Sequence, residues 1–415
     1  MKSKGIALAL VLLLAISTNT VPKASAAVPK SGQKCNKLGL TQTFEGKKFT
    51  CIKSGKKYVW NKGVQLKPIP IPSPSKSNVV AEIVSAEKAE PNFGCSKNNE
   101  TAFTLQGAVI CKNSLWQIVP ISEDSIESRA FRYVIEHWNS QPAGNLTIDF
   151  YIDQNAGTWV NEIELGLRTG ARFWGTSAPG SKPIPAFISD DPVFIEESLA
   201  KAGIVQSVED KLRNRNARGG QAGFHGGDPM YWDFLFKNAQ NRSNVGYFQV
   251  GPHEYTHFAQ FKLVGSGNWG EAGPWFNEGL ASFIGSALGP MCKMPHNQMD
   301  GWRENLNSYS TSKLIFFNES KPEVYGSPNW GDVYPLGAMA TQALVALVGI
   351  DSIYSLYRDL GANVGRDAAF KKNFKLESRP LANFLQEYID SIYLNKEWSL
   401  PTLEEKYKVA IANNP

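Results

Sequence analysis

Two of the chain's five histidines stand four residues apart, in the segment HEYTH at residues 253–257. Side chains four residues apart on an α-helix project from one face, about one turn apart along the axis, so both imidazoles can reach one metal ion. The glutamate beside the first histidine can then hold the water that the ion activates. The pattern predicts a helix that carries the zinc ligands His253 and His257 and the general base Glu254.

The two residues before this segment constrain where its helix starts. They are Gly251 and Pro252, and proline is tolerated in the first turn of a helix but not deep inside it. We therefore expect the helix either to begin at the ligands or to be kinked there.

A catalytic zinc site needs a third protein ligand and one open position. Metzincins have a glycine three residues after the second histidine and a third histidine at six, but this chain has Gln260 and Leu263 there, which excludes that class. The segment WFNEGLASF at residues 275–283 has apolar side chains at helical spacing around Glu278. Glu278 is the predicted third ligand.

The segments HEYTH and NEGLA resemble the two ligand helices of gluzincin peptidases, the clan that contains thermolysin and the aminopeptidase N family. A third segment, YPLGAM at residues 334–339, is similar to the stretch that supplies the transition-state tyrosine in aminopeptidase N relatives. The resemblance covers residues 240–395, including expected helices at 353–360, 368–374 and 381–392. It implies a gluzincin-like catalytic domain with one Zn²⁺ per chain, a peptide or protein substrate, and Tyr334 as the oxyanion donor.

Two neighbouring features qualify this resemblance. The chain has no Gly-Ala-Met-Glu-Asn segment upstream of HEYTH, so recognition of a free substrate amino terminus is not implied. Asp332, two residues before Tyr334, is expected to cap the helix that begins there.

The amino terminus has the pattern of a secretory signal peptide. Lys2 and Lys4 precede an apolar run at residues 5–16, and Ala-Ser-Ala follows at 24–26. The run is too short for a membrane-spanning helix, which needs about 20 apolar residues. We expect residues 1–26 to be removed and the mature protein to be secreted or cell-wall associated, without a transmembrane span.

Four of the five cysteines form two pairs with the same spacing, Cys35 with Cys51 and Cys95 with Cys111. Each pair is followed by a tryptophan and encloses a phenylalanine and a glycine. Since exported thiols persist as disulfides, the repeat predicts two small disulfide-stapled, β-rich modules at residues 27–66 and 91–120. A Pro/Ser-rich linker at 67–90 is expected to be extended, and Cys292 is left as a free thiol.

The first module is strongly basic. Residues 27–70 contain ten lysines and one glutamate, whereas the whole chain has a net charge of only +5. Such a patch attracts polyanions. Outside a cell, the abundant polyanions are cell-wall polymers and lipid headgroups rather than nucleic acid. We therefore predict that the first module could bind anionic wall polymer and that the protein does not bind nucleic acid.

The remaining sequence predicts a multidomain protein whose last domain is α+β at residues 121–250 and helical at 251–415. Its first part alternates expected helices at 122–139, 158–173 and 193–216 with expected strands at 145–153, 182–189 and 219–227. The last of these strands is rich in glycine and could pair with an extended substrate. His137, His225 and His296 are expected to be ordinary surface or core residues.

The sequence points to a secreted zinc metallopeptidase of gluzincin type and leaves two alternatives open. The first is a catalytically inactive or non-peptidase cell-wall-binding protein, in which the modules are the function. The second is a zinc amidase that acts on wall amides, because the same ion, base and oxyanion donor serve any amide.

Overall fold

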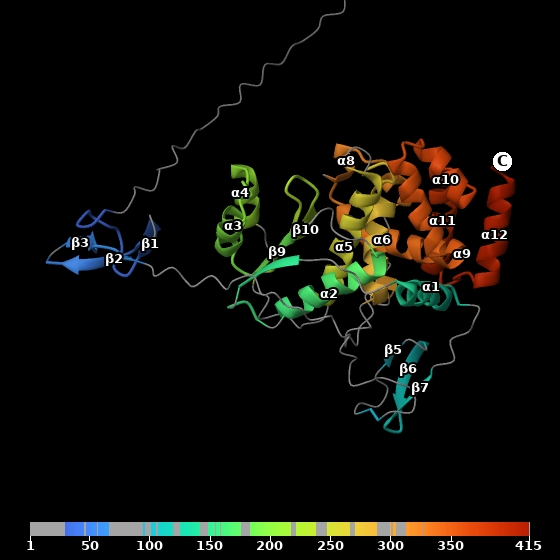
Figure 1. Cartoon of the computed structure of the whole chain (residues 1–415), viewed down its shortest axis with the longest axis horizontal. Helices are drawn as coiled ribbons and strands as arrows, with labels where there is room; N and C mark the ends of the chain where they lie inside the picture. Colours follow the sequence, from blue (N-terminus) through green and yellow to red (C-terminus); the bar gives the residue numbers. More distant parts are fainter. Residues whose placement is uncertain are drawn as a thin grey trace, which may run out of the picture. The chain divides into compact units, whose positions relative to one another are not determined.

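The computed structural model describes residues 30–65, 94–118 and 125–414 apart from gaps within these ranges (Figure 1). The longest gap runs from 289 to 312, where only Met299, Trp302 and Arg303 are described. Contacts divide the chain into two compact units, residues 1–73 and 74–415. The predicted signal peptide, the whole predicted linker at 67–90, Cys292 and His296 lie outside the described residues.

The first module is a small antiparallel sheet stapled by a disulfide. Its strands are β1 (Thr41–Phe44), β2 (Lys47–Ser54), β3 (Lys57–Trp60) and β4 (Val64–Gln65). The predicted Cys35–Cys51 disulfide is present, and Cys51 pairs across the strands with Trp60. Both cysteines, Phe49 and Trp60 form the module's buried core. The staple supplements a core that is too small to be stable alone.

The second module repeats this plan in three strands, β5 (Thr101–Thr104), β6 (Gly107–Lys112) and β7 (Leu115–Ile118). The predicted Cys95–Cys111 disulfide is present. Cys111 pairs across the strands with Trp116, just as Cys51 pairs with Trp60, although the two hairpins differ in length. The predicted pairing of the cysteines and the internal repeat are therefore confirmed.

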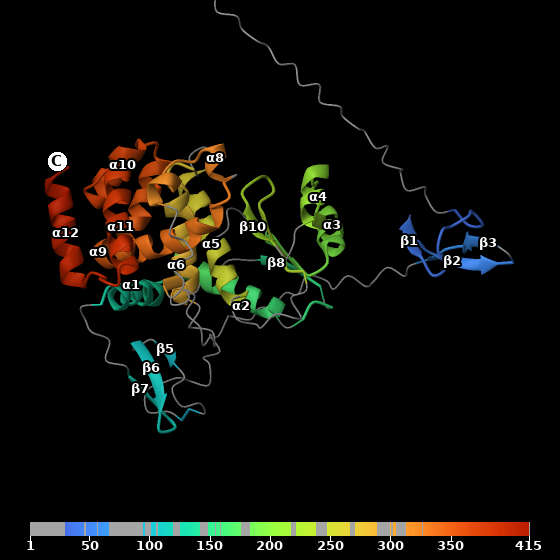
Figure 2. The ribbon, with the colours of Figure 1, turned by 180° about the vertical axis from the view of Figure 1, so that it is seen from behind.

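A four-stranded mixed sheet follows, in the order β10-β11-β9-β8. β8, β9 and β11 are parallel neighbours, and β10 lies antiparallel at the edge. Phe187 and Leu235 on one face pack against α3, while Trp232 and Phe234 on the other face belong to the main core. Figures 1 and 2 show this sheet from both sides, with α3 and α4 at one flank. The bounds of these elements are β8 Ile148–Ile152, β9 Ile184–Ser189, β10 Gln221–His225, β11 Tyr231–Leu235, α3 Pro192–Lys201 and α4 Val208–Asn216.

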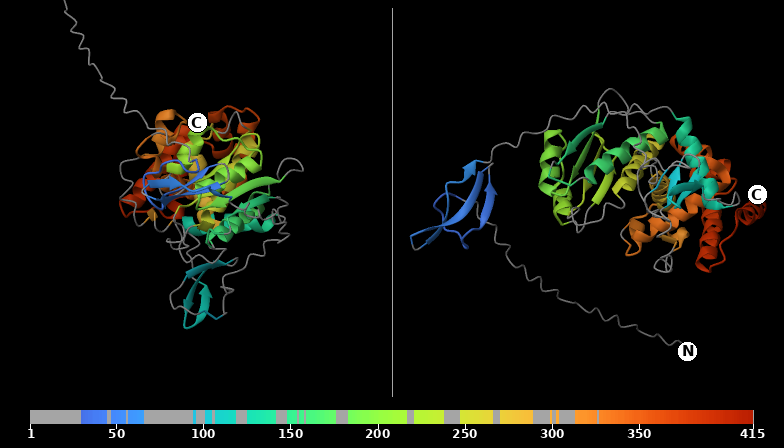
Figure 3. Two further views of the ribbon diagram at one scale, coloured as in Figure 1. Left: turned by 90° about the vertical axis from the view of Figure 1, so that its left-hand side faces the viewer. Right: turned by 90° about the horizontal axis from the view of Figure 1, so that it is seen from below.

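The helices pack around α9, the longest helix among the described residues, which contacts α1, α5, α6, α10 and α11. Figure 3 shows the yellow, orange and red helices of this part of the chain gathered together in two further views. The segment Trp330–Gly361 is long and apolar enough to cross a membrane by length and composition, but 78% of its most apolar stretch is buried, as in a soluble core helix. Gly349, at φ 73°, interrupts the helical geometry of α9, a conformation that L-residues with side chains rarely adopt. The elements are α1 Ile126–Ser140, α2 Trp159–Trp174, α5 Tyr247–Val264, α6 Pro274–Leu288, η4 Leu314–Phe317, α8 Pro322–Tyr325, η5 Trp330–Asp332, α9 Val333–Gly361, α10 Arg366–Phe374, α11 Ser378–Tyr393 and α12 Leu400–Ala412.

The start of α5 excludes one of the two alternatives expected from the Gly251-Pro252 pair. The helix does not begin at the ligands, because it starts at Tyr247 and includes Pro252. The reason is a close crossing with α2, where a Cβ atom at Gly251 would lie 2.5 Å from the backbone nitrogen of Leu167, and one at Gly166 would lie 2.9 Å from the Pro252 ring. The Gly-Pro pair thus fits a tight helix contact.

Candidate metal centre

The predicted ligands come from two helices that approach each other closely. His253 and His257 lie on α5, and Glu278 lies on α6. At their contact, a Cβ atom on Gly285 would lie 2.7 Å from the carbonyl oxygen of Gln249 and 3.4 Å from the Cβ of His253. Only glycine fits there without displacing the backbone, so Gly285 lets α6 approach the ligand-bearing face of α5.

The three side chains converge on one point. The two imidazole Nε2 atoms are 3.1 Å apart, and Glu278 Oε2 lies 3.2 Å from the Nε2 of His257 and 3.5 Å from that of His253. Zinc–ligand bonds of about 2.0–2.1 Å in tetrahedral geometry put neighbouring donor atoms about 3.3–3.4 Å apart. Among the described residues, this is the one group of three or more potential metal ligands that lie together. Its donor set and spacing fit a tetrahedral ion such as Zn²⁺.

The site stabilises positive charge. Burial alone would lower the pKa of His257, but the carboxylate of Glu278 outweighs it and raises that pKa to about 9. Burial would also raise the pKa of the Glu278 carboxyl. The neighbouring His257 and His253 have the larger, opposite effect, so the pKa of Glu278 lies well below its ordinary value. A buried carboxylate that faces two imidazoles favours a bound cation.

Two further side chains hold the imidazoles. His257 Nδ1 lies 2.9 Å from Gln260 Oε1, and His253 Nδ1 lies 3.4 Å from Ser282 Oγ. From the sequence, Gln260 is only a departure from the metzincin pattern, and Ser282 is given no role. Gln260 stands three residues after His257, and Ser282 stands four residues after Glu278, so each lies one helical turn from a predicted ligand. This spacing is the sequence signal from which both could have been predicted.

Glu254 lies between the ligands and the edge of the sheet. It is only 6% exposed, and its Oε2 accepts a hydrogen bond of 2.9 Å from the backbone N–H of Phe224 in β10. The indole of Trp232 donates to the backbone carbonyl of Glu254. The predicted glycine-rich strand therefore orients the predicted general base, a contact that the sequence analysis did not anticipate.

Tyr334 lies in the first turn of α9, next to the ligands. Its ring centroid is 6.0 Å from that of His253, and its side chain hydrogen-bonds that of Trp330. Burial, and then the charge of Glu278, raise the pKa of its hydroxyl, which keeps it protonated. Asp332 occupies the N-cap position of α9, but its side chain makes no capping hydrogen bond, so the predicted capping role is wrong.

A glycine pair brings α9 to this position. A Cβ atom on Gly279 would lie 2.3 Å from the carbonyl carbon of Gly337, and one on Gly337 would lie 2.4 Å from the carbonyl oxygen of Trp275. Gly279 belongs to the NEGLA segment and Gly337 to the YPLGAM segment. The glycines of both segments thus allow the helix of Glu278 and the helix of Tyr334 to cross in contact.

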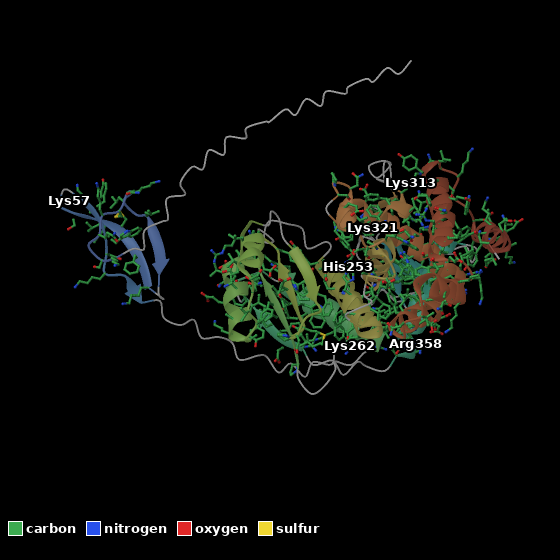
Figure 4. The ribbon with its side chains drawn as sticks, turned by 90° about the horizontal axis from the view of Figure 1, so that it is seen from above. Lys57, His253, Lys262, Lys313, Lys321 and Arg358 are labelled. Atoms are coloured by element: carbon green, nitrogen blue, oxygen red, sulfur yellow. A yellow bond between two sulfur atoms is a disulfide. The ribbon has the colours of Figure 1, made fainter. Side chains whose placement is uncertain are left out.

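A cavity of about 340 Å³ opens beside these residues. Figure 4 labels His253, one of its lining residues, within the helical part of the chain. Polar side chains of Gln249 and Ser282 line it together with apolar ones. The apolar lining residues are Ala222, Phe236, Val250, Trp302 and Pro335.

Two other histidines lie outside this centre, as expected. The ring of His225 stacks on Tyr231 with centroids 4.1 Å apart, and its Nε2 lies 3.1 Å from Asp233 Oδ1. His137 contacts the backbone carbonyl of Phe173 through its Nε2, and burial lowers its pKa. Each of these contacts accounts for its histidine without a metal.

No protein-family model, no curated protein and no solved structure matches the chain. The chemistry of the site is therefore inferred from its own side chains.

Proposed function

We propose that the chain is an exported zinc-dependent metallopeptidase of gluzincin type. The observation that carries this proposal is the convergence of His253, His257 and Glu278 at tetrahedral donor spacing, with Glu254 and Tyr334 beside them. Two histidines and one carboxylate are the ligand set of catalytic zinc sites that keep one position open.

The mechanism divides the work among the chain's own residues. A zinc ion held by the three ligands supplies a Lewis acid that polarises the scissile carbonyl and acidifies water. Glu254 takes a proton from that water and later delivers it to the leaving amine. The N–H of Phe224 holds Oε2 and thereby fixes the orientation of this carboxylate. Tyr334, kept protonated by its environment, donates its hydroxyl proton to the developing oxyanion.

The edge strand supports an extended substrate. The N–H of Phe224 points away from β11 toward Glu254, and alternation along a strand gives Ala222, two residues earlier, the same direction. Ala222 also lines the cavity. Its backbone groups could therefore pair with a substrate chain laid beside β10. A strand edge next to the site favours an extended peptide substrate over a compact wall amide. Peptide hydrolysis is therefore the first candidate function, and hydrolysis of wall amides is the second.

Replacement of the base tests this proposal. Glu254→Gln keeps the shape and can still accept from Phe224, but it cannot take a proton, so peptide hydrolysis should fall by at least about 10²-fold while zinc stays bound. Glu271→Gln, which changes an exposed carboxylate, is the control and should keep full activity. Retained hydrolysis in Glu254→Gln would contradict the assigned base. Turnover of wall fragments but not of peptides would replace the peptidase by the amidase.

The first module suggests a surface-binding function. Every lysine whose burial is described there is exposed, among them Lys53, Lys57 and Lys62 (Figure 4 labels Lys57). We propose that these lysines bind anionic wall polymer electrostatically.

Co-sedimentation of the full chain with purified walls at low and high salt measures this binding. Replacing Lys53, Lys57 and Lys62 with Gln should weaken it, and high salt should weaken the wild type, because exposed charges are screened beyond about 8 Å at physiological ionic strength. Replacing the exposed Lys201, Lys396 and Lys408 gives a control with the same change of charge. Equal loss in both variants, or none in either, would contradict a role for the module.

A further inference from the structure

Gln260 is the most completely engaged side chain next to the metal ligands. It is fully buried on α5, three residues after His257. Its Nε2 donates to the backbone carbonyl of Asn277 over 3.0 Å. It also hydrogen-bonds the hydroxyl of Tyr357, which donates its own proton to Asn277 Oδ1 over 2.9 Å. The tyrosine oxygen can then only accept from Gln260, so both partners face the amide nitrogen.

This arrangement fixes which atom of Gln260 meets the ligand. With Nε2 held by two acceptors, Oε1 is the atom that lies 2.9 Å from His257 Nδ1. An amide oxygen accepts and never donates, so Nδ1 must carry the proton. The lone pair of a neutral His257 is therefore on Nε2, the atom that faces Glu278 and His253.

The first ligand lacks an equivalent contact. Its Nδ1 lies 3.4 Å from the hydroxyl of Ser282, and a hydroxyl can either donate or accept. Ser282 thus orients the ring of His253 without selecting its tautomer.

We propose that Gln260 is the positioning residue that sets the tautomer of His257 and thereby the affinity of the site for its metal, with Asn277 and Tyr357 holding the amide in place. The proposal rests on the proposed zinc site. Gln260 links His257 on α5 to α6 through Asn277 and to α9 through Tyr357. Loss of such a contact to a metal-bound histidine typically weakens metal affinity 10- to 100-fold.

Zinc affinity, measured by competition with a chelator, tests the proposal independently of activity. Gln260→Met, which keeps the side chain's length without its amide, should bind zinc about 10- to 100-fold more weakly than the wild type. Gln342→Met is the matched control, because Gln342 is also a buried glutamine and its Oε1 accepts from Arg303 away from the ligands. Unchanged affinity in Gln260→Met, or equal weakening in both variants, would overturn the proposal.

A second measurement reads the tautomer itself. In cadmium-substituted protein with isotope-labelled histidines, NMR coupling to the metal should appear at Nε2 of His257, with a protected proton on Nδ1. Coupling at Nδ1 would overturn the proposal.

Tyr357→Phe covers the case in which Gln260→Met does not fold. It removes one of the two partners of the amide nitrogen and should weaken zinc about two- to tenfold, the effect of one hydrogen bond. An unchanged zinc affinity in Tyr357→Phe would then overturn the proposal. Failure of the wild type to bind zinc is a different outcome, because it would contradict the proposed function itself.

Discussion

The crossing of α6 and α9 predicts a large effect from adding a single methyl group. Gly279→Ala places a Cβ atom where the nearest backbone atom, the carbonyl carbon of Gly337, is 2.3 Å away. Ordinary van der Waals contacts begin at about 3.4 Å, so the helices must separate by about 1 Å. The obstacle is backbone and not the end of a flexible side chain, which leaves no cheap local adjustment.

The magnitude follows from this displacement. Overpacking a well-packed core costs typically 1–3 kcal/mol, and a clash between two helix backbones belongs at the upper end, about 3 kcal/mol. Tyr334 lies one turn before Gly337 on α9, so its hydroxyl shifts away from the ligands together with the helix. A misplacement of about 1 Å can cost 10²-fold in rate.

Urea denaturation and peptide hydrolysis, measured on the same preparations, provide the assay. Gly365→Ala is the control, because a Cβ atom there meets nothing within 4 Å. Gly279→Ala should lose both stability and turnover, and Gly365→Ala should lose little of either. Wild-type stability and turnover in Gly279→Ala would refute the account of how the two helices position Tyr334.

Three further predictions concern Tyr334, Trp302 and Glu162. Tyr334→Phe should lower turnover about 10²- to 10³-fold without loss of zinc if the hydroxyl stabilises an oxyanion, whereas an unchanged rate would leave Tyr334 with packing alone. Trp302→Ala should lower kcat/KM about tenfold for peptides with a large apolar side chain beside the scissile bond, and little for small ones, because Trp302 lines the cavity; equal losses for both would contradict the subsite. Burial raises the pKa of Glu162 from 4.5 to about 6, so its ionisation destabilises the fold increasingly as pH rises from about 4.5 to 6 and fully above that. Since the side chain is only partly buried, Glu162→Gln should add at most about 1 kcal/mol above pH 6 and nothing near pH 4, and equal gains at both pH values in thermal unfolding would contradict the cause.

The grouping of the candidate ligands and the two disulfides could be predicted because their signals are local or repeated. The spacing of His253 and His257 needs only helical geometry to bring both rings together. The two cysteine pairs shared a spacing, and the structure places Trp60 and Trp116 in the same cross-strand position. In each case, residues close in sequence determine the contact.

Other features could not be predicted because their sequence signal is ambiguous or because they join residues that are distant in the chain. β11 went unrecognised because it is buried on both faces and so lacks an alternating pattern, with Asp233 in its middle. The hydrogen bond from Phe224 to Glu254 joins residues 30 apart. The contact of Gly279 with Gly337 requires two helices to cross, and the sequence of neither helix predicts that crossing.

The most direct measurement is the zinc content of the purified protein beside that of His257→Ala. The account predicts one zinc per wild-type chain, tightly held against dialysis, and strong loss of zinc from His257→Ala. His225→Ala, which changes a histidine paired with Asp233 outside the centre, should retain its zinc. Equal zinc in the wild type and His257→Ala, or none in the wild type after zinc loading, would contradict the assignment of the metal centre.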